Sequence, residues 1–414
     1  MVMNLGAVGA MIAQTQQHAR PQGKLGWKQQ LVLDQKRPPI ITPGDYARMS
    51  STEQSEYNSA RRAYHQGLSD IETTQMAGAH EAFAQRLDGL TTAGPVAKPG
   101  LMISGPAASG KSTTLITAGR LTDLACTRAM DEAGALFWPE DEQLIPRLVE
   151  TGHQYLPVIY LSVAAQVNAT LENGVRFYIQ DLPPQRKYGQ SRLLDMLISH
   201  VYNCGTKVIL LDQVQTIASA SVGALAVSNA IKDLMDGCPT SIIVGAGIGL
   251  EHNRLFTENF RTEDAALAQT GSRFALYTMA PYEISTKEGL REWLRLLATM
   301  DSHICLLRKG DRDLIDLSEY LYSRTGGLAG LVIPLLRSGA NRAISSGEER
   351  ITESLLDKIL TSAVKDMSSG HVSVSKDLAS RGARQPKSRP PRPQSPGKRR
   401  SHIRSTPAAA GAAP

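Results

Sequence analysis

The stretch Gly105-Pro-Ala-Ala-Ser-Gly-Lys-Ser112 constrains the fold of this chain more than any other feature. It matches the pattern G-x-x-x-x-G-K-[ST], in which glycines let the backbone curl so that its N–H groups face the phosphates of a nucleotide. That function requires a strand before the loop and a helix after it. The apolar run at 100–104 and the helical pattern from about residue 110 meet the requirement. The sequence therefore predicts a phosphate-binding loop, and a plain glycine turn before a helix is the weaker alternative.

The loop residues predicted to bind nucleotide are Gly105, Pro106, Ala107, Ala108, Ser109, Gly110, Lys111, Ser112 and Thr113. Lys111 would reach the β- and γ-phosphates, and the Ser112 hydroxyl would ligate Mg²⁺. A second element, "KVILLDQVQ" at 207–215, runs from a buried strand into Asp212, which would hold the metal directly or through water. The alternative is an aspartate that caps the next helix. The predicted cofactors are therefore ATP and Mg²⁺.

The residue after Asp212 is Gln213, where a nucleotide hydrolase normally has glutamate. A glutamate would polarise or deprotonate the attacking water, and such assistance is worth about 10²–10⁴-fold in rate. Glutamine keeps the shape without the charge, so hydrolysis could be lost. Gln213 could instead orient water, as glutamine does in some P-loop GTPases, or be an engineered change that traps ATP. Gln213 is a candidate catalytic residue, and whether the chain is an ATPase stays open.

Strands and helices alternate over the central part of the chain. Short apolar runs at 100–104, 156–163, 207–211, 240–247 and 273–279 read as strands, and helical segments such as 189–203 and 223–237 separate them. Continuous apolar strands in such an alternation predict an α/β fold, with a parallel sheet covered by helices on both faces. After about residue 284 only helical periodicity remains, which predicts a small all-helical lid domain.

These patterns divide the chain into five predicted parts. They are a flexible N-terminal segment (1–40), a helical N-terminal extension (41–95), the nucleotide-binding domain (96–283), the helical lid (284–368) and a disordered basic tail (369–414). Pro43 with Asp45, and Ser51 with Glu53, mark helix starts in the extension.

Composition places the chain in a reducing, aqueous compartment. Four cysteines without C-x-x-C spacing argue against disulfides and zinc, and fit the cytoplasm. No window approaches 18 uninterrupted apolar residues, so no membrane span is expected. The apolar start "MVMNLGAVGAMIAQ" lacks the basic region of a secretory signal.

The basic character of the chain comes from its tail. From His371 to the end there are ten Lys or Arg residues and one acidic residue, Asp377, a net charge of +9, so the rest of the chain carries −3 of the overall +6. Such a segment can bind nucleic-acid backbone by counterion release, although it has no aromatic residues to stack on bases. A solubilising or partner-docking tail is the alternative.

Several arginines could balance phosphate charge. Arg273, before the last strand, is the candidate catalytic residue that would reach into the nucleotide site of a neighbouring subunit. A surface arginine is the alternative, and Arg254 or Arg261 could take the role instead. Arg324 and Arg337 in the lid could contact nucleotide in the same subunit or be solvated helix charges.

With these features in place, the chain resembles the AAA+ ATPases and, more narrowly, the TniB/TnsC regulators of transposition. The resemblance covers roughly residues 40–365 and includes "SEYNSARRAYHQGL", "GLMISGPAASGKSTT", "KVILLDQVQTI", "SRFALYTMAPY" and "LSEYLYSRTGGLAGLVIPLLRSGANRAI". It implies an AAA+ P-loop fold in which the loop and Asp212 bind MgATP. It also implies that Arg273 acts across a subunit interface in a ring or filament on duplex DNA, which recruits or stimulates a transposase.

The chain departs from that family at two positions. Family members usually have Asp-Glu where this chain has Asp212-Gln213, and a threonine-like residue near Ala246. The predicted function is thus an ATP-binding regulator of transposition with slow or impaired hydrolysis. The alternatives are a nucleotide-binding pseudo-ATPase scaffold, and a signalling or initiator ATPase unrelated to transposition.

Overall fold

The computed structural model describes residues 21, 23–31, 36–92, 100–134, 136, 142–164, 166–179, 188–217, 222–250 and 273–360. The predictions for residues 1–20 and for the basic tail lie outside these ranges. All described residues belong to one compact unit, Met1–Met367.

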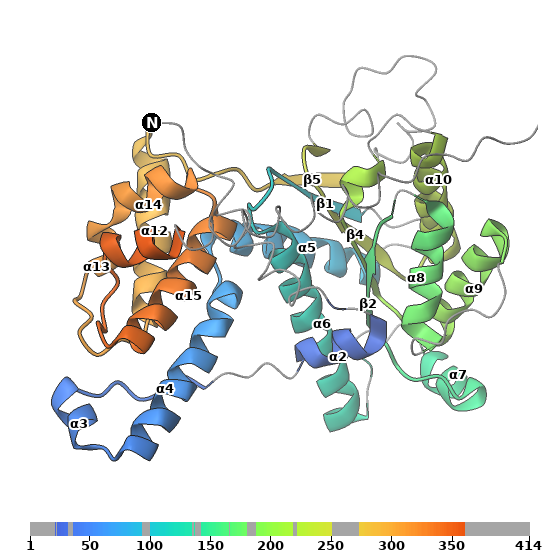
Figure 1. Ribbon diagram of the computed structural model, residues 1–414. Helices are drawn as coiled ribbons and strands as arrows, with labels where there is room; N and C mark the ends of the chain where they lie inside the picture. The colour runs from blue at the N-terminus through green and yellow to red at the C-terminus, as the bar shows by residue number, and fades with distance from the viewer. Residues whose placement is uncertain are drawn as a thin grey trace, which may run out of the picture. The chain divides into compact units, whose positions relative to one another are not determined.

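A five-stranded sheet, parallel at every pairing, carries the fold (Figure 1). The strands are β1 (Gly100–Ser104), β2 (Val158–Ser162), β3 (Val208–Asp212), β4 (Ile242–Ala246) and β5 (Phe274–Thr278), in the spatial order β2-β3-β4-β1-β5. The five predicted strands are confirmed. Strands β1 to β4 are buried almost throughout, as expected of apolar runs in a covered parallel sheet, whereas β5 at one edge of the sheet is only partly buried. The register places the last residues of neighbouring strands side by side: Ser162 pairs with Asp212, and Asp212 with Ala246.

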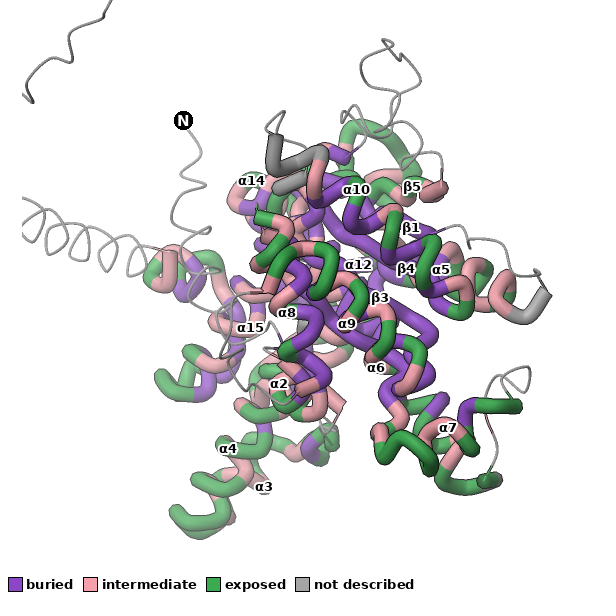
Figure 2. The backbone as a smooth tube through the Cα atoms, turned by 90° about the vertical axis from the view of Figure 1, so that its right-hand side faces the viewer, coloured by how far each residue is buried: buried purple, intermediate pink, exposed green. Residues whose placement is uncertain are grey.

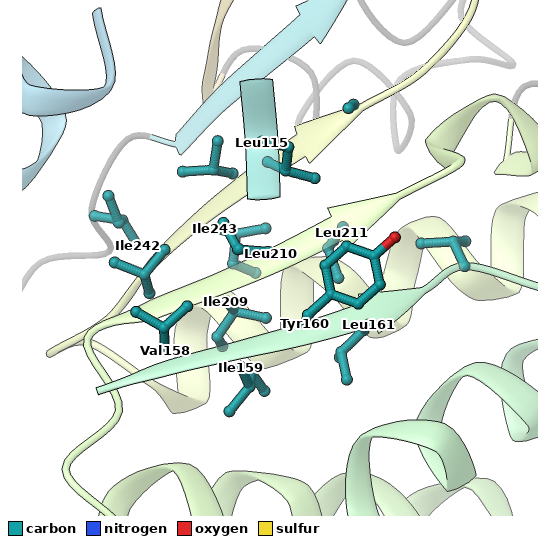
Figure 3. Close-up of a cluster of buried hydrophobic side chains, with 14 of the residues drawn as sticks. Leu115, Val158, Ile159, Tyr160, Leu161, Ile209, Leu210, Leu211, Ile242 and Ile243 are labelled. Atoms are coloured by element: carbon teal, nitrogen blue, oxygen red, sulfur yellow. The ribbon is translucent and has the colours of Figure 1, made fainter. Parts of the chain in front are cut away.

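Helices cover both faces of this sheet. They are α6 (Lys111–Ala133), α7 (Leu144–Thr151), α8 (Val167–Ile179), α9 (Gln190–Asn203), the short 3₁₀ helix η2 (Val214–Ile217) and α10 (Val222–Gly237). Figure 1 shows α6 on one face and α8 to α10 on the other. Figure 2 shows β1, β3 and β4 in the colour of buried residues, whereas β5 has intermediate and exposed residues. The close-up in Figure 3 shows how the side chains of β2 and β3 fill the space between strand and helix.

The residues after β5 form a second, all-helical core. Its helices are α12 (Lys287–His303), α13 (Asp313–Asp316), α14 (Ser318–Thr325), α15 (Ala329–Ser346) and a last helix at 353–360. Apolar side chains at helical spacing, among them Trp293, Leu297 and Leu336, are buried together. This is the predicted helical lid, here called the lid.

The N-terminal helices divide between the two cores. They are α2 (Gly23–Leu31), α3 (Pro43–Arg48), α4 (Ser51–Gln66), the 3₁₀ helix η1 (Gly67–Asp70) and α5 (Thr74–Thr92). Capping boxes at Thr42 and Ser50 begin α3 and α4, as the sequence predicts. Trp27 of α2 and Phe83 of α5 join the core of the sheet, whereas Leu68 of η1 joins the lid core.

A buried ion pair fixes α4 to the lid. The Arg61 guanidinium is fully buried and donates to both carboxylate oxygens of Glu349, at 2.6 and 2.8 Å. Glu349 follows α15, and its Oε2 also accepts from the backbone N–H of Leu307 at 3.0 Å. The predicted extension at 41–95 is therefore shared between sheet and lid.

The observed fold is an α/β fold in which a parallel sheet is covered by helices on both faces and followed by a small all-helical lid, as predicted. The exact domain boundaries stay a prediction. All four cysteines are buried and free. Among the described helices, none combines the length and the apolar character needed to cross a membrane.

Candidate nucleotide-binding site

The phosphate-binding loop curls at the end of β1 because three residues adopt left-handed backbone conformations. Gly105 has a φ of 149°, Ala108 of 61° and Gly110 of 97°. A side chain at Gly105 would place its Cβ 2.3 Å from the Met279 carbonyl oxygen, so only glycine fits there. The loop ends on α6, whose N-terminal N–H groups and dipole favour an anion. The loop therefore has the curled backbone at a helix N-terminus that the motif predicts, and phosphate binding by it stays a prediction.

The Lys111 ammonium points into the loop. Its Nζ donates to the Pro106 carbonyl oxygen at 2.5 Å and to Ser109 Oγ at 3.2 Å, and the side chain is buried. A cation held by loop oxygens in a buried position can exchange those acceptors for phosphate oxygens, which carry full charge.

Ser112 and Asp212, the two predicted magnesium ligands, are in direct contact. Ser112 Oγ donates to Asp212 Oδ1 at 2.9 Å, although the residues are a hundred positions apart. One hydroxyl and one carboxylate fit Mg²⁺, which takes few protein ligands and completes its shell with phosphate oxygens and water. Within the described residues there is no group of three His, Cys, Asp or Glu side chains that could hold a metal by itself. The donor set thus fits a metal that arrives with a nucleotide.

Gln213 adopts a backbone conformation that is unusual for its residue type. Its φ is 66°, in the left-handed region, and its N–H donates to Asp212 Oδ1 at 2.9 Å. Such outliers cost of order 1–3 kcal/mol and cluster at functional sites. Ser162 Oγ, at the end of β2, donates to Gln213 Oε1 at 3.0 Å. The side chain is held in place, but an amide cannot accept a proton from water.

The end of β4 also lacks a polar side chain. Ala246 pairs in register with Asp212, and Gly247 follows it; both line the same cavity as the loop. Neither can hydrogen-bond a phosphate through its side chain. Two positions that line the cavity, 213 and 246, therefore carry no ionisable side chain.

The lid closes one side of this cavity. The backbone N–H of Gly330, in the first turn of α15, donates to the Ala108 carbonyl oxygen at 2.9 Å. A Cβ at Gly330 would lie 2.5 Å from that oxygen, so the close approach depends on glycine. The cavity beneath has a volume of about 240 Å³ and is lined by the loop, Asp212, Gln213 and α15.

Arg337 of α15 also lines this cavity. In the part of the chain that the structure describes, no carboxylate or other acceptor pairs with its guanidinium, and burial lowers its pKa. The sequence left open whether Arg337 is a solvated charge, and the structure places it beside the phosphate loop. The register of α15 explains this placement: Gly330, Ile333, Pro334 and Arg337 are spaced i, i+3, i+4 and i+7, so they share one face.

Apolar side chains also line the cavity. Its lining includes Met76 of α5, Met279 after β5, and Ile333 and Pro334 of α15, with Thr73 as a polar neighbour. Sequence reasoning did not identify these residues, because each lies in an ordinary helical or strand pattern. Their common location on three separate elements gives a flat aromatic base a surface to pack on.

Two of the remaining candidate arginines, Arg273 and Arg324, do not line the cavity. Arg273 precedes β5, and its carbonyl oxygen accepts from the Gly100 N–H at the start of β1. Arg273 therefore lies at the amino ends of the strands, whereas the phosphate-binding loop of the same chain lies at their carboxyl ends. Its guanidinium pairs with Asp236. Arg324 pairs with Asp357 at 2.8 Å and does not line the cavity, which favours its interpretation as a lid charge. Arg254 and Arg261 lie outside the described residues.

Comparisons with known proteins find similarity at the level of the structure. No protein-family model matches the chain, and no curated protein sequence matches it. Solved structures that are similar include the ORC1 protein of Aeropyrum pernix in complex with DNA (17% identity, TM-score 0.49, 72% of this chain and 66% of that one). The ORC2 protein of the same organism matches at 17% identity and a TM-score of 0.43, over 69% and 67% of the two chains.

Domain III of the Thermotoga maritima replication initiation protein DnaA matches at 12% identity and a TM-score of 0.36, over 71% of this chain and 95% of that domain. Similarity at this level does not transfer a ligand or a partner to this chain.

Proposed function

We propose that the chain binds ATP with Mg²⁺ in this cavity. The observation that carries the proposal is the convergence of Lys111, Ser112, Asp212 and Arg337 on one cavity at the N-terminus of α6. The loop residues Gly105 to Thr113 would surround the phosphates, and the apolar lining residues would contact the base. Magnesium, held by Ser112 and Asp212, would neutralise charge on the β- and γ-phosphates.

We further propose that hydrolysis is slow or impaired. Gln213 cannot act as a general base, and Ser162 already uses one acceptor position of its Oε1. The missing charge corresponds to a rate loss of about 10²–10⁴-fold. Bound ATP would then persist, and the ATP-bound state would be long-lived.

The wider function that we propose is regulation of DNA transposition. It is supported by the resemblance of residues 40–365 to the TniB/TnsC regulators and by the charge of +9 in the tail. In this proposal the chain oligomerises as a ring or filament on duplex DNA in the cytoplasm and recruits a transposase. Arg273 would leave Asp236 and enter the neighbouring subunit's site.

Nucleotide binding and turnover are tested with three proteins: the natural chain, Lys111→Ala and Gln213→Glu. We expect the natural chain to bind a fluorescent ATP analogue in Mg²⁺, and Lys111→Ala to lose that binding. We expect Gln213→Glu to hydrolyse ATP about 10²-fold faster than the natural chain. Turnover by the natural chain at an ordinary enzymatic rate, about 1 s⁻¹ or more, would show that Gln213 is a working water-positioning residue.

The pseudo-ATPase scaffold is the second candidate, and the absence of an ionisable side chain at positions 213 and 246 favours it. It predicts ATP binding without turnover and without ATP-dependent assembly. Sedimentation with duplex DNA separates the two, since the regulator should pellet with DNA only in ATP, and less at higher salt. An initiator-type ATPase would also bind DNA, but only the transposition regulator is expected beside a gene for a DDE transposase.

A further inference from the structure

A buried tyrosine on β2 contacts the carboxylate of Asp212. Tyr160 Oη donates to Asp212 Oδ2 at 2.7 Å, and the ring is only 5% exposed. We propose that Tyr160 is a positioning residue that holds Asp212 in the orientation needed for Mg²⁺, and that helix α2 keeps Tyr160 in place. The proposal rests on the proposed nucleotide function and adds a residue and a segment to it.

The sheet register explains the contact. Tyr160 pairs with Leu210, two residues before Asp212 on the neighbouring strand. Side chains alternate along a strand, so Leu210 and Asp212 lie on one face, and Tyr160 meets Asp212 as a diagonal neighbour. Figure 3 shows the Tyr160 ring on β2 with its hydroxyl oxygen directed toward the carboxyl end of the strands. The long ring lets a residue inside the core reach the edge where the loop lies.

The hydrogen bonds fix both oxygens of the carboxylate. Oδ1 accepts from Ser112 Oγ and from Gln213 N–H, both at 2.9 Å, while Oδ2 accepts from Tyr160. Asp212 is 2% exposed, so water can do little to replace a lost donor. Partners of this kind orient metal-binding carboxylates, and their removal typically weakens metal affinity about 10–100-fold.

Helix α2 supports the tyrosine from outside the sheet. The Trp27 ring stacks on the Tyr160 ring, with centroids 6.2 Å apart and planes 12° from parallel. Trp27 is 1% exposed, and its Nε1 donates to Asp123 Oδ2 on α6 at 2.9 Å. Residue 119 of α6 is glycine, and a Cβ there would lie 3.0 Å from the Trp27 ring and 2.4 Å from Leu210. The Trp27 indole therefore packs in the space that is free because residue 119 has no side chain.

This arrangement connects an N-terminal helix to the magnesium ligand in two contacts. Trp27 restricts the Tyr160 ring, and Tyr160 restricts Asp212. In a purely structural role, the tyrosine hydroxyl would only satisfy a buried acceptor, and its removal would change stability alone. In the proposed role, its removal also changes how strongly nucleotide binding depends on Mg²⁺.

The test measures the affinity of a fluorescent ATP analogue in Mg²⁺ and in EDTA, together with the unfolding temperature. For Tyr160→Phe we expect unchanged affinity in EDTA, since the loop is intact, and about tenfold weaker affinity in Mg²⁺. The matched control is Tyr178→Phe. Tyr178 is also buried, and its hydroxyl lies 2.9 Å from Thr206 Oγ1, but it does not line the cavity. This control should lower the unfolding temperature without changing the ratio of the two affinities.

If the natural chain binds the analogue more tightly in Mg²⁺ than in EDTA, and Tyr160→Phe shows the same ratio of the two affinities, the role of Tyr160 is overturned. If the natural chain shows no Mg²⁺-dependent binding, the proposed function itself fails. Trp27→Phe tests whether α2 supports Tyr160. We expect a smaller loss of affinity in Mg²⁺ than for Tyr160→Phe. A ratio of the affinities in Mg²⁺ and EDTA equal to that of the natural chain would overturn the role of α2.

Discussion

Substitution of Arg337 tests most directly whether a side chain at this site contributes to nucleotide binding or to the stability of the fold. Its guanidinium lines the cavity beside the phosphate loop, and no described residue pairs with it. Burial lowers its pKa, which means that the folded state disfavours the charge. Leucine is well tolerated in helices. For Arg337→Leu we therefore expect two effects of opposite sign: weaker ATP binding, and equal or higher stability of the protein without ligand.

The magnitudes follow from the same contacts. A hydrogen bond to a charged group is worth about 1.5–3 kcal/mol, or about 10- to 150-fold in affinity. Because the cavity is partly open to solvent, which screens the interaction, we expect the lower end, about tenfold weaker ATP binding. Without nucleotide, removal of an unpaired cation should leave the free energy of unfolding unchanged or slightly higher.

The assay is thermal unfolding with and without ATP and Mg²⁺, supported by titration with a fluorescent analogue. Arg337→Leu should unfold at or above the temperature of the natural chain without ligand, and gain less from ATP. The control is Arg324→Leu, which removes a lid charge paired with Asp357 outside the cavity and should leave nucleotide affinity unchanged. A variant that loses stability without ligand but binds ATP normally would refute the reasoning.

Two further predictions concern the joint between α4 and the lid. Arg61→Met leaves the buried Glu349 carboxylate without its partner, so urea unfolding should show a loss of about 3–5 kcal/mol. A loss below about 1 kcal/mol would place that pair in the class of weak surface bridges. Burial lowers the pKa of His65 from 6.5 to about 4. Its unfolded state therefore binds the proton first, and stability should fall by on the order of 3 kcal/mol as pH drops from 6.5 to 4. His65→Gln should flatten this part of the pH profile.

The parts of the fold that could be predicted from sequence are those determined by local pattern. Strands β1 to β4 are apolar runs because they are buried almost throughout, and the loop is recognisable because its glycines and Lys111 lie within a few residues of one another. The capping boxes at Thr42 and Ser50 are local as well. In each case the residues that determine the structure are neighbours in the chain.

The parts that sequence reasoning missed depend on contacts between distant segments. Tyr160 reads as one more apolar residue in a buried strand, and only the pairing of β2 with β3 shows that its hydroxyl meets Asp212. The position of Arg337 follows from Gly330 touching Ala108, a contact between residues more than two hundred positions apart. Periodicity identifies a helix face but does not identify what that face contacts.

In the proposed function, binding and turnover depend on different residues of this site. Affinity would come from the loop after β1, from Asp212 at the end of β3 and from the lid face of α15, all of which line the cavity. Turnover would depend on the positions after β3 and at the end of β4, where Gln213 and Ala246 stand. Because Gln213 and Ala246 line the same cavity as the loop, a proton acceptor at 213 would face the phosphates without replacing any of the proposed ligands. Substitutions at 213 should therefore change the lifetime of bound ATP far more than its affinity, whereas Arg337 and Tyr160 should do the reverse.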